Sequence, residues 1–360
     1  GLGDVYKRQF LFCIGLLLTV ATIVNAQSVT WISSTEGNVW QKSKVKLQSK
    51  SEQNPVLQVD GTENGVAFKN WGTTFNELCW DALGLLTRTE QDEILYNIFS
   101  PQGDLRITRG RISMGANDYA RSWYSCDEVE GDFELRYFNI NRDKQTIIPF
   151  IRAAQKYNPN LTFWISPWCP PSWMKINGDY PVLSSPFNSL SEKQNYLLYG
   201  ATGGQVDENE MKLTGARDGV FPRQLATTDF MIQDPRYLQT YADYFCRFID
   251  AYKEQGIPID MVMYQNEAYS YTPYPGCAWT ATGTIRFNKE YLAPTLRQMH
   301  PEVKLYLGTF NTNRQDHVET ILADTALCNC IRGMGFQWEG REILPVSYTH
   351  LRAHETKANL

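Results

Sequence analysis

The stretch DPRYLQTYADYFCRFIDAYKEQGIPIDMVMYQNE (234–267) contains one complete helix and the strand that follows it. Asp234 and Pro235 are typical of a helix start, since Asp caps free N–H groups and Pro fits the first turn. Large apolar residues then return on one face, at positions 241, 245, 248 and 252, until Gly256 ends the helix. The apolar run that follows predicts a buried strand that ends on Glu267.

The same alternation of apolar runs and amphipathic helices extends through most of the chain. The apolar runs lie at 65–72, 105–115, 161–168, 261–267, 304–310 and 331–338. Repeated strand–helix alternation indicates an α/β fold with a parallel sheet and crossover helices. A doubly wound sheet is one alternative. A (β/α)8 TIM barrel is favoured because Asp118, Trp168 and Glu267 each follow a different strand, as barrel active-site residues do. The polar, Gly-rich segment 176–230 is expected to be a long loop over that end of the barrel.

The N-terminal part has a different rhythm. Between residues 27 and 64, short runs of alternating apolar residues are broken by Gly, Asn and Pro, a pattern that predicts antiparallel strands. We therefore expect a partial β-sandwich side domain over 27–64, and a barrel domain over 65–345 that stops after about its sixth strand.

Both ends of the chain contain sequence that we exclude from the fold. Residues 10–26 combine an apolar run with small residues before a cleavage point after Ala26, which predicts a signal peptide. The run is short for a membrane span, so we expect a secreted, periplasmic or cell-surface protein without stable membrane insertion after cleavage. Residues 1–9 and 346–360 resemble translated adapter sequence and are interpreted as artefacts.

Composition excludes several classes of function. The net charge of -5 argues against nucleic acid as a partner, because that partner requires clustered Lys and Arg. With only 4 His in the chain, a His-based triad or an HExxH zinc site has little to use. Cys328 and Cys330 form a lone CxC, for which buried or paired thiols are favoured over a metal site. We therefore expect no metal and no cofactor, and chemistry done by carboxylates.

Glu267 is the strongest candidate for that chemistry. A carboxyl group at a strand end is partly desolvated, which raises its pKa and suits a general acid. The adjoining Asn266 offers a neutral donor for a sugar hydroxyl. Aromatic residues make up 13% of the chain, which suits a carbohydrate binder, because sugar C–H faces stack on aromatic rings.

The chain resembles glycoside hydrolase family 30, the glucocerebrosidase-like enzymes, from about Asn70 to Leu344. The motifs that carry the resemblance are NWGTTFNELCWDAL (70–83), RISMGANDYARSWYSCDE (111–128), SPWCPPSWMK (166–175), MYQNEA (263–268) and GFQWEGREI (335–343). It implies a retaining glycosidase that hydrolyses a β-linked glucoside or glucan, such as a glucosylceramide-like substrate or a β-1,6-glucan.

The resemblance also implies a role for each matching residue. Glu267 corresponds to the general acid/base, and Asn266 to the residue that contacts the sugar 2-hydroxyl. Asp118 matches an acid that grips the distal hydroxyls. Trp168 and Trp338 match aromatic residues around the innermost subsite, and Arg111 matches a residue that braces the catalytic carboxylates. Other readings stay open: Asp118 as a helix cap, Trp168 as core and Arg111 as a structural ion-pair partner.

The chain departs from the family pattern in three places, all of which bear on the substrate. Residues 70–73 replace a Gly-Phe-Gly-Gly turn, Ala268 replaces a Pro, and Phe-Gln-Trp-Glu at 336–339 replaces the frequent His-Trp-Tyr. Two alternatives to a β-glucosidase remain. One is a non-catalytic carbohydrate-binding protein, and the other is an endo-xylanase of the same family.

A retaining mechanism needs a second carboxylate about 5–5.5 Å from the first. The resemblance places this nucleophile on a seventh barrel strand, beyond Pro345. Glu339 and Glu342 belong to the sixth strand's loop and helix start and are poor substitutes. We therefore expect the chain to be a fragment without its nucleophile, inactive by itself.

Overall fold

The computed structural model describes residues 28–46, 70–190, 229–270, 272–312 and 314–343. The chain divides into two compact units, residues 1–67 and 68–360. The predicted signal peptide, both adapter-like ends and most of the predicted loop 176–230 lie outside the described residues. No helix in the described ranges is long and apolar enough to span a membrane.

The first unit contains an antiparallel hairpin. Strand β1 (Ser28–Thr35) pairs with β2 (Asn38–Lys46), as the alternating sequence predicts. Gly37 takes the left-handed conformation that the two-residue turn requires, with φ +78°. The third run expected here, residues 56–60, lies outside the described residues.

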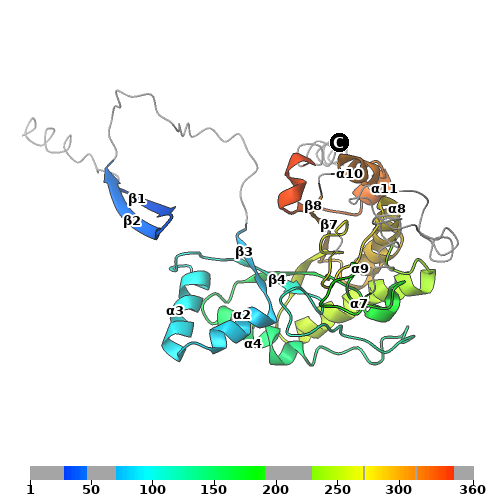
Figure 1. Cartoon of the computed structure of the whole chain (residues 1–360), viewed down its shortest axis with the longest axis horizontal. Helices are drawn as coiled ribbons and strands as arrows, with labels where there is room; N and C mark the ends of the chain where they lie inside the picture. The colour runs from blue at the N-terminus through cyan, green and yellow to red at the C-terminus, as the bar shows by residue number, and fades with distance from the viewer. Residues whose placement is uncertain (1–27, 47–69, 191–228, 271, 313, 344–360) are drawn as a thin grey trace, which may run out of the picture. The chain divides into compact units, whose positions relative to one another are not determined.

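The second unit is built on one parallel sheet of six strands, ordered β3-β4-β5-β6-β7-β8 (Figure 1). Their bounds are β3 (Gly72–Phe75), β4 (Arg109–Ser113), β5 (Thr162–Ser166), β6 (Ile259–Met263), β7 (Lys304–Phe310) and β8 (Met334–Phe336). Every neighbouring pair is parallel, and spatial order equals chain order. This is the strand order of a barrel rather than of a doubly wound sheet, whose order reverses part-way.

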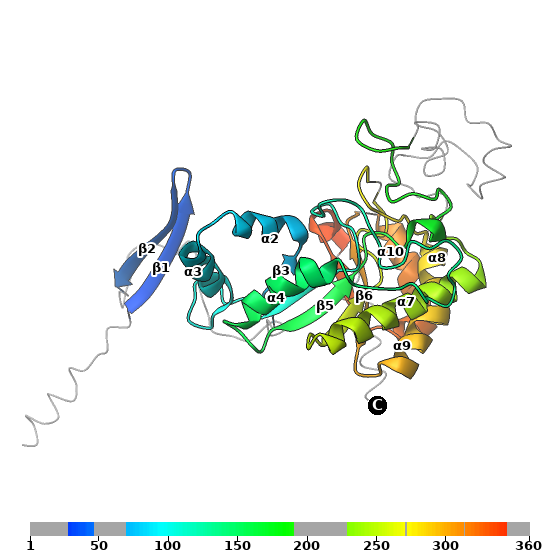
Figure 2. The same ribbon diagram turned by 90° about the horizontal axis from the view of Figure 1, so that it is seen from below.

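Helices connect the strands along the outside of the sheet (Figures 1 and 2). They are α2 (Glu77–Gly84), α3 (Arg88–Phe99), α4 (Ile147–Gln155), α7 (Pro235–Glu254), α8 (Ala281–Arg286), α9 (Ala293–Met299), α10 (Gln315–Leu322) and α11 (Thr325–Cys328). A π-helical stretch, η4 (Phe287–Leu292), joins α8 to α9, and 3-10 helices occur at η1 (Asp143–Gln145), η2 (Ser172–Met174) and η5 (Trp338–Ile343). Helix α4 packs against β3, and α7 packs against β6 and α9.

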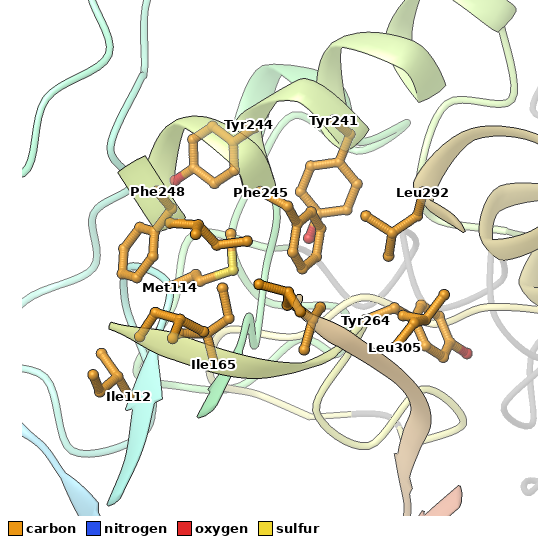
Figure 3. Close-up of a cluster of buried hydrophobic side chains, with 14 of the residues drawn as sticks. Ile112, Met114, Ile165, Tyr241, Tyr244, Phe245, Phe248, Tyr264, Leu292 and Leu305 are labelled. Atoms are coloured by element: carbon orange, nitrogen blue, oxygen red, sulfur yellow. The ribbon is translucent and has the colours of Figure 1, made fainter. Parts of the chain in front are cut away.

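Helix α7 shows how the local sequence fixes the architecture. Asp234 caps its first turn by accepting a hydrogen bond from the Arg236 N–H (2.8 Å), and Pro235 occupies the first helical position. The four aromatic residues expected on its inner face, at 241, 245, 248 and 252, are fully buried. Figure 3 shows the Tyr and Phe rings of α7 directed toward Ile112, Met114 and Ile165 of the sheet region. Burying one such side chain contributes about 1.5–3 kcal/mol, so this face holds the helix on the sheet.

The two faces of the sheet differ in chemistry, with the period of two that a strand imposes. Phe75, Phe163 and Ile165 are fully buried, and the Phe75 ring packs on Phe99 of α3 and Phe150 of α4. The alternate residues of β4 and β5 are polar or aromatic: Arg111 pairs in register with Trp164, and Arg109 forms an ion pair with Asp260. The inner face can therefore present charged groups without disturbing the apolar layer under the helices.

The strand predictions are confirmed in number and order, with errors at the boundaries. The strand expected at 261–267 is β6, which ends at Met263, so Glu267 follows the strand and does not end it. The first strand was expected at 65–72, whereas β3 begins at Gly72 and runs to Phe75. The apolar Val66, Ala67 and Phe68 attracted the prediction, but β-branched Thr73 and Thr74 with Phe75 form the strand. At the other extreme, the strand predicted at 304–310 is β7 with identical bounds.

Candidate active site

The candidate residues gather where the parallel strands end. Arg111 lies in β4, and Trp168 follows β5 by two residues. Asn266 and Glu267 follow β6, and Trp338 follows β8 by two residues. Since all strands are parallel, these ends lie along one edge of the sheet, where α/β proteins build their sites.

Arg111 holds the centre of this group. Its guanidinium donates to the Ser166 hydroxyl at 2.7 Å and to Asn266 Oδ1 at 2.7 Å. The same group lies over the rings of Trp168, at 4.1 Å, and Trp164, at 4.8 Å. Burial lowers the pKa of Arg111 to about 9, against the opposing charges of Asp118 and Glu267. Arg111 therefore stays cationic at neutral pH, and its charge lowers the pKa values of Asp118 and Glu267 against the effect of burial.

Asn266 is held in one orientation. Its side-chain oxygen accepts hydrogen bonds from Arg111, from the Thr309 hydroxyl (3.2 Å) and from Gln337 Nε2 (3.1 Å). Its backbone N–H donates to the Pro167 carbonyl at 2.7 Å, which ties the end of β6 to the end of β5. Trp168 is buried beside it, and its carbonyl accepts from Gln265 Nε2 at 2.6 Å.

Glu267 has a strained backbone. Its φ of +50° lies in the left-handed region, which costs a residue with a Cβ roughly 1–2 kcal/mol. The Glu267 N–H points to the Thr309 hydroxyl at 3.4 Å, and its carbonyl accepts from the Ser270 N–H at 2.9 Å. Strain of this kind in a side chain that is half-buried at a sheet edge is typical of functional sites.

The electrostatic environment of Glu267 favours its protonated form. Burial raises the pKa of its carboxyl group, and the nearby charge of Asp118 raises it further. Hydrogen bonds from Ser270 and Asn311 and the charge of Arg111 act in the opposite direction without cancelling the rise. A carboxyl group that keeps its proton toward neutral pH is what a general acid requires.

Asp118 and Tyr274 complete the charged part of the site. Asp118 keeps an exposed side chain, yet partial desolvation raises its pKa against the attraction of Arg111. Burial and the charges of Glu267 and Asp118 raise the pKa of Tyr274 to about 12. The Tyr274 hydroxyl therefore remains a neutral donor close to both carboxyl groups.

Trp338 and Glu339 lie at the outer end of the group. Trp338 is 67% exposed and begins η5. Glu339 is exposed, and its backbone N–H donates to Asn311 Oδ1 at 3.1 Å. The structure thus brings Arg111, Asp118, Trp168, Asn266 and Glu267 into one interacting group and places Trp338 at its exposed margin.

Four residues of this group were not singled out from the sequence: Ser166, Tyr274, Thr309 and Asn311. Three of them lie at the end of a strand or directly after it, so the rule that found Glu267 also applied to Ser166, Thr309 and Asn311. Tyr274 follows β6 by eleven residues in an irregular segment, where spacing carries no signal.

Within the described ranges, no cluster of three or more His, Cys, Asp or Glu residues is arranged to hold a metal ion. The seven cysteines there are free, five of them buried. Cys328 and Cys330, the lone CxC, donate to the carbonyls of Leu322 and Ala326.

Comparison with known proteins identifies the domain. Residues 68–185 match the model of the glycosyl hydrolase family 30 TIM-barrel domain. Over these residues the chain is similar to glycoside hydrolase family 30. The resemblance predicted from the sequence motifs is thereby confirmed, and the chain is a relative of glycosidases.

Curated relatives agree with this assignment. The chain is 26% identical to putative glucosylceramidase 3 of Caenorhabditis elegans over 358 residues, which cover 94% of this chain and 59% of the relative. It is 24% identical to endo-1,6-beta-D-glucanase neg1 of Aspergillus fumigatus over 278 residues, which cover 76% of this chain and 50% of the relative. The chain spans about half the length of the curated relatives that it matches.

Solved structures show the same fold. SrfJ from Salmonella typhimurium matches 85% of this chain with a TM-score of 0.60 at 20% identity, over 59% of its own length. The endo-beta1,6-glucanase BT3312 matches 79% with a TM-score of 0.57 at 21% identity, over 55% of its own length. The six-stranded sheet is therefore part of a TIM-barrel fold, as predicted.

Proposed function

We propose that the protein is a retaining β-glycosidase and that Glu267 is its general acid/base. The observation that carries the proposal is the state of Glu267: half-buried, strained, and with a raised pKa beside Arg111. A proton held there is available to the glycosidic oxygen, and the resulting carboxylate then activates water for the second step.

The neighbours supply binding and orientation. With its oxygen engaged, Asn266 presents its amide nitrogen as a donor, which suits a sugar 2-hydroxyl. Asp118 is an exposed acceptor suited to distal hydroxyls, and the ring of Trp168 offers an apolar wall. Arg111 is hydrogen-bonded to Asn266 and Ser166, and its positive charge offsets the negative charges of Asp118 and Glu267.

The nucleophile is proposed to be a carboxylate outside the described residues. A retaining enzyme separates its two carboxyl groups by about 5–5.5 Å, and the resemblance assigns the second to a seventh strand. Asp118 has the position proposed for substrate binding, and Glu339 is exposed on η5.

A β-glucoside is the proposed substrate, with a glucosylceramide-like lipid or a β-1,6-glucan as the physiological form. Relatives named for both activities match the chain at similar identity, 26% and 24%. A structural neighbour, the GH30 xylanase C of Talaromyces cellulolyticus, has a TM-score of 0.53, so xylan is kept in the panel of substrates to be tested. Export through a leader over residues 10–26 is proposed as well, and N-terminal sequencing of the secreted protein tests it.

The test compares Glu267→Gln with wild type, both expressed from the complete gene, on two aryl β-glucosides. Phenol is a poor leaving group that needs the acid, whereas dinitrophenolate leaves unaided. We expect turnover of the phenyl glucoside to fall about 10²–10⁴-fold, with a far smaller loss in the first step of the dinitrophenyl substrate. Added azide should rescue the variant as the β-glucosyl azide, since it needs no general base.

Glu93→Gln, on the exposed surface of α3, is the matched control and should equal wild type. Equal losses on both leaving groups would contradict the acid/base role. Sugar binding by calorimetry without turnover of any substrate in the panel would instead favour a carbohydrate-binding protein.

A further inference from the structure

The residue directly after β8, Gln337, makes two hydrogen bonds that link three strand ends. Its Nε2 donates to the Thr309 hydroxyl at 2.8 Å and to Asn266 Oδ1 at 3.1 Å. Its backbone N–H donates to the Phe310 carbonyl at 2.7 Å, which fixes Gln337 to the end of β7. One side chain therefore connects the end of β8 to the ends of β7 and β6.

The side-chain hydrogen bonds that reach Asn266 in this network all end on its oxygen. Asn266 Oδ1 accepts hydrogen bonds from Arg111, Thr309 and Gln337, which occupy the acceptor capacity of this oxygen. Its Nδ2 has no hydrogen-bond partner among the residues that the structure describes. Because three donors converge on the oxygen, a flipped amide would place its N–H groups against other donors, and that state is unfavourable.

Thr309 links this hydrogen-bond network to the backbone of Glu267. Its hydroxyl donates to Asn266 and accepts from Gln337, and the N–H of Glu267 points to it from 3.4 Å. That N–H belongs to Glu267, whose backbone has the left-handed conformation. Gln337 therefore fixes the hydroxyl that supports the strained residue.

We propose that Gln337 is a positioning residue that orients the Asn266 amide toward the sugar 2-hydroxyl and, through Thr309, holds the Glu267 backbone. The inference rests on the proposed function and deepens it. It also gives a physical meaning to a departure in the sequence, since Gln337 belongs to the segment 336–339 that differs from the pattern of family 30. A Gln side chain donates without titrating, so the orientation of Asn266 does not change with pH.

The decisive variant, made in protein expressed from the complete gene, is Gln337→Glu, which keeps the shape of the side chain and replaces the donor by an acceptor that faces two oxygens. We expect kcat/KM on an aryl β-glucoside to fall about 10- to 100-fold, mainly in kcat, because the 2-hydroxyl contact strengthens in the transition state. The aryl 2-deoxy-β-glucoside lacks that hydroxyl, so the loss of kcat/KM on it should be smaller. The remaining loss should come from the effect of Gln337, through Thr309, on the Glu267 backbone. Gln337→His restores an N–H donor and should recover most of the rate.

The matched control is Gln255→Glu, at the C-terminal end of α7, where the side-chain oxygen that accepts from Arg152 is kept. It should behave as wild type on both substrates. Equal losses for Gln337→Glu on the glucoside and the 2-deoxyglucoside, or no loss on either, would overturn the proposal while leaving the acid/base role of Glu267 intact.

A second readout does not depend on turnover. In ¹⁵N-labelled protein, the side-chain amide signals of Asn266, assigned with an Asn266→Asp variant, should move in Gln337→Glu and stay in Gln255→Glu. If the wild type hydrolyses no β-glycoside, the proposed function fails, and this measurement still decides the network. Unmoved Asn266 signals in Gln337→Glu would show that Gln337 does not orient this amide.

Discussion

Two glutamates of this molecule follow parallel strands at the same edge of the sheet, yet they are in opposite states. Glu77 follows β3 and begins α2, while Glu267 follows β6. Glu77 is 1% exposed, more deeply buried than Glu267. Burial alone would raise the pKa of Glu77, but hydrogen bonds from Arg142 and from the Arg121 N–H lower it below 4.5.

The difference lies in what each arginine does. Arg142 donates to both carboxylate oxygens of Glu77, from Nε at 2.8 Å and from Nη2 at 2.6 Å, in a bidentate ion pair. Arg111 instead donates hydrogen bonds to Ser166 and Asn266. It therefore acts on the pKa of Glu267 through its charge, without a direct hydrogen bond. Burial therefore does not distinguish a structural carboxylate from the one proposed to be catalytic. The geometry of the nearest cation does.

The largest effect is expected at the structural member of this pair. Glu77→Ala removes a carboxylate that is 1% exposed and leaves the partly exposed Arg142 and the Arg121 N–H without this acceptor. We expect a loss of about 3 kcal/mol, the lower end of the cost of breaking a buried ion pair. Chemical unfolding of the variant and wild type measures it. Asp81→Ala, which removes the exposed partner of Arg121, is the control and should change stability little. A Glu77→Ala protein as stable as wild type would break the comparison.

At Glu267 the sign of the stability change should be reversed. Glycine adopts a φ of +50° without strain, so Glu267→Gly should gain about 1 kcal/mol while losing glycoside turnover. Gly replacing Leu85, an exposed residue with φ -79° directly after α2, is the control and should gain nothing. A loss of stability in Glu267→Gly would mean that its side chain holds the fold, as Glu77 does.

The smallest effect separates the two carboxyl groups by pH. The raised pKa of Glu267 gives a stabilisation that is present below 4.5 and lost as pH rises through its folded value. The lowered pKa of Glu77 gives a stabilisation present above 4.5 and lost as pH falls through its folded value. Relative to wild type, Glu267→Gln should therefore gain stability above pH 4.5.

Glu77→Gln should be less stable than wild type above pH 4.5, and this difference in stability should disappear only below pH 4.5. Melting temperatures at half-unit steps from pH 3 to 8 measure both curves. Parallel curves for the two variants would show that the carboxyl groups share one environment.

The sequence predicts the sheet well because each strand is a separate local signal. Helix α7 could be read from its cap, its aromatic face and its terminal Gly, and β7 from one apolar run. The boundary of β3 was missed because the apolar residues before it are a stronger pattern than its two threonines.

The site was predicted only in part, for a physical reason. Residues that bear charge at strand ends, such as Glu267 and Asp118, carry a signal in the sequence. The contacts of Thr309, Asn311 and Gln337 depend on how three strands are staggered in space, and neutral side chains give no sign of it. The same limit hid the bidentate ion pair of Glu77, which the sequence equally allows as a cap or a substrate ligand.

The most direct test of the central claim is a ¹³C NMR titration of the Glu267 carboxyl carbon, with Glu77 as the internal reference. The two signals are assigned by Glu267→Gln and Glu77→Gln. The account predicts that Glu267 titrates above its ordinary value of 4.5 and Glu77 below it. A Glu267 signal that titrates at or below 4.5 would contradict the account, because its carboxyl group would then hold no proton for catalysis near neutral pH.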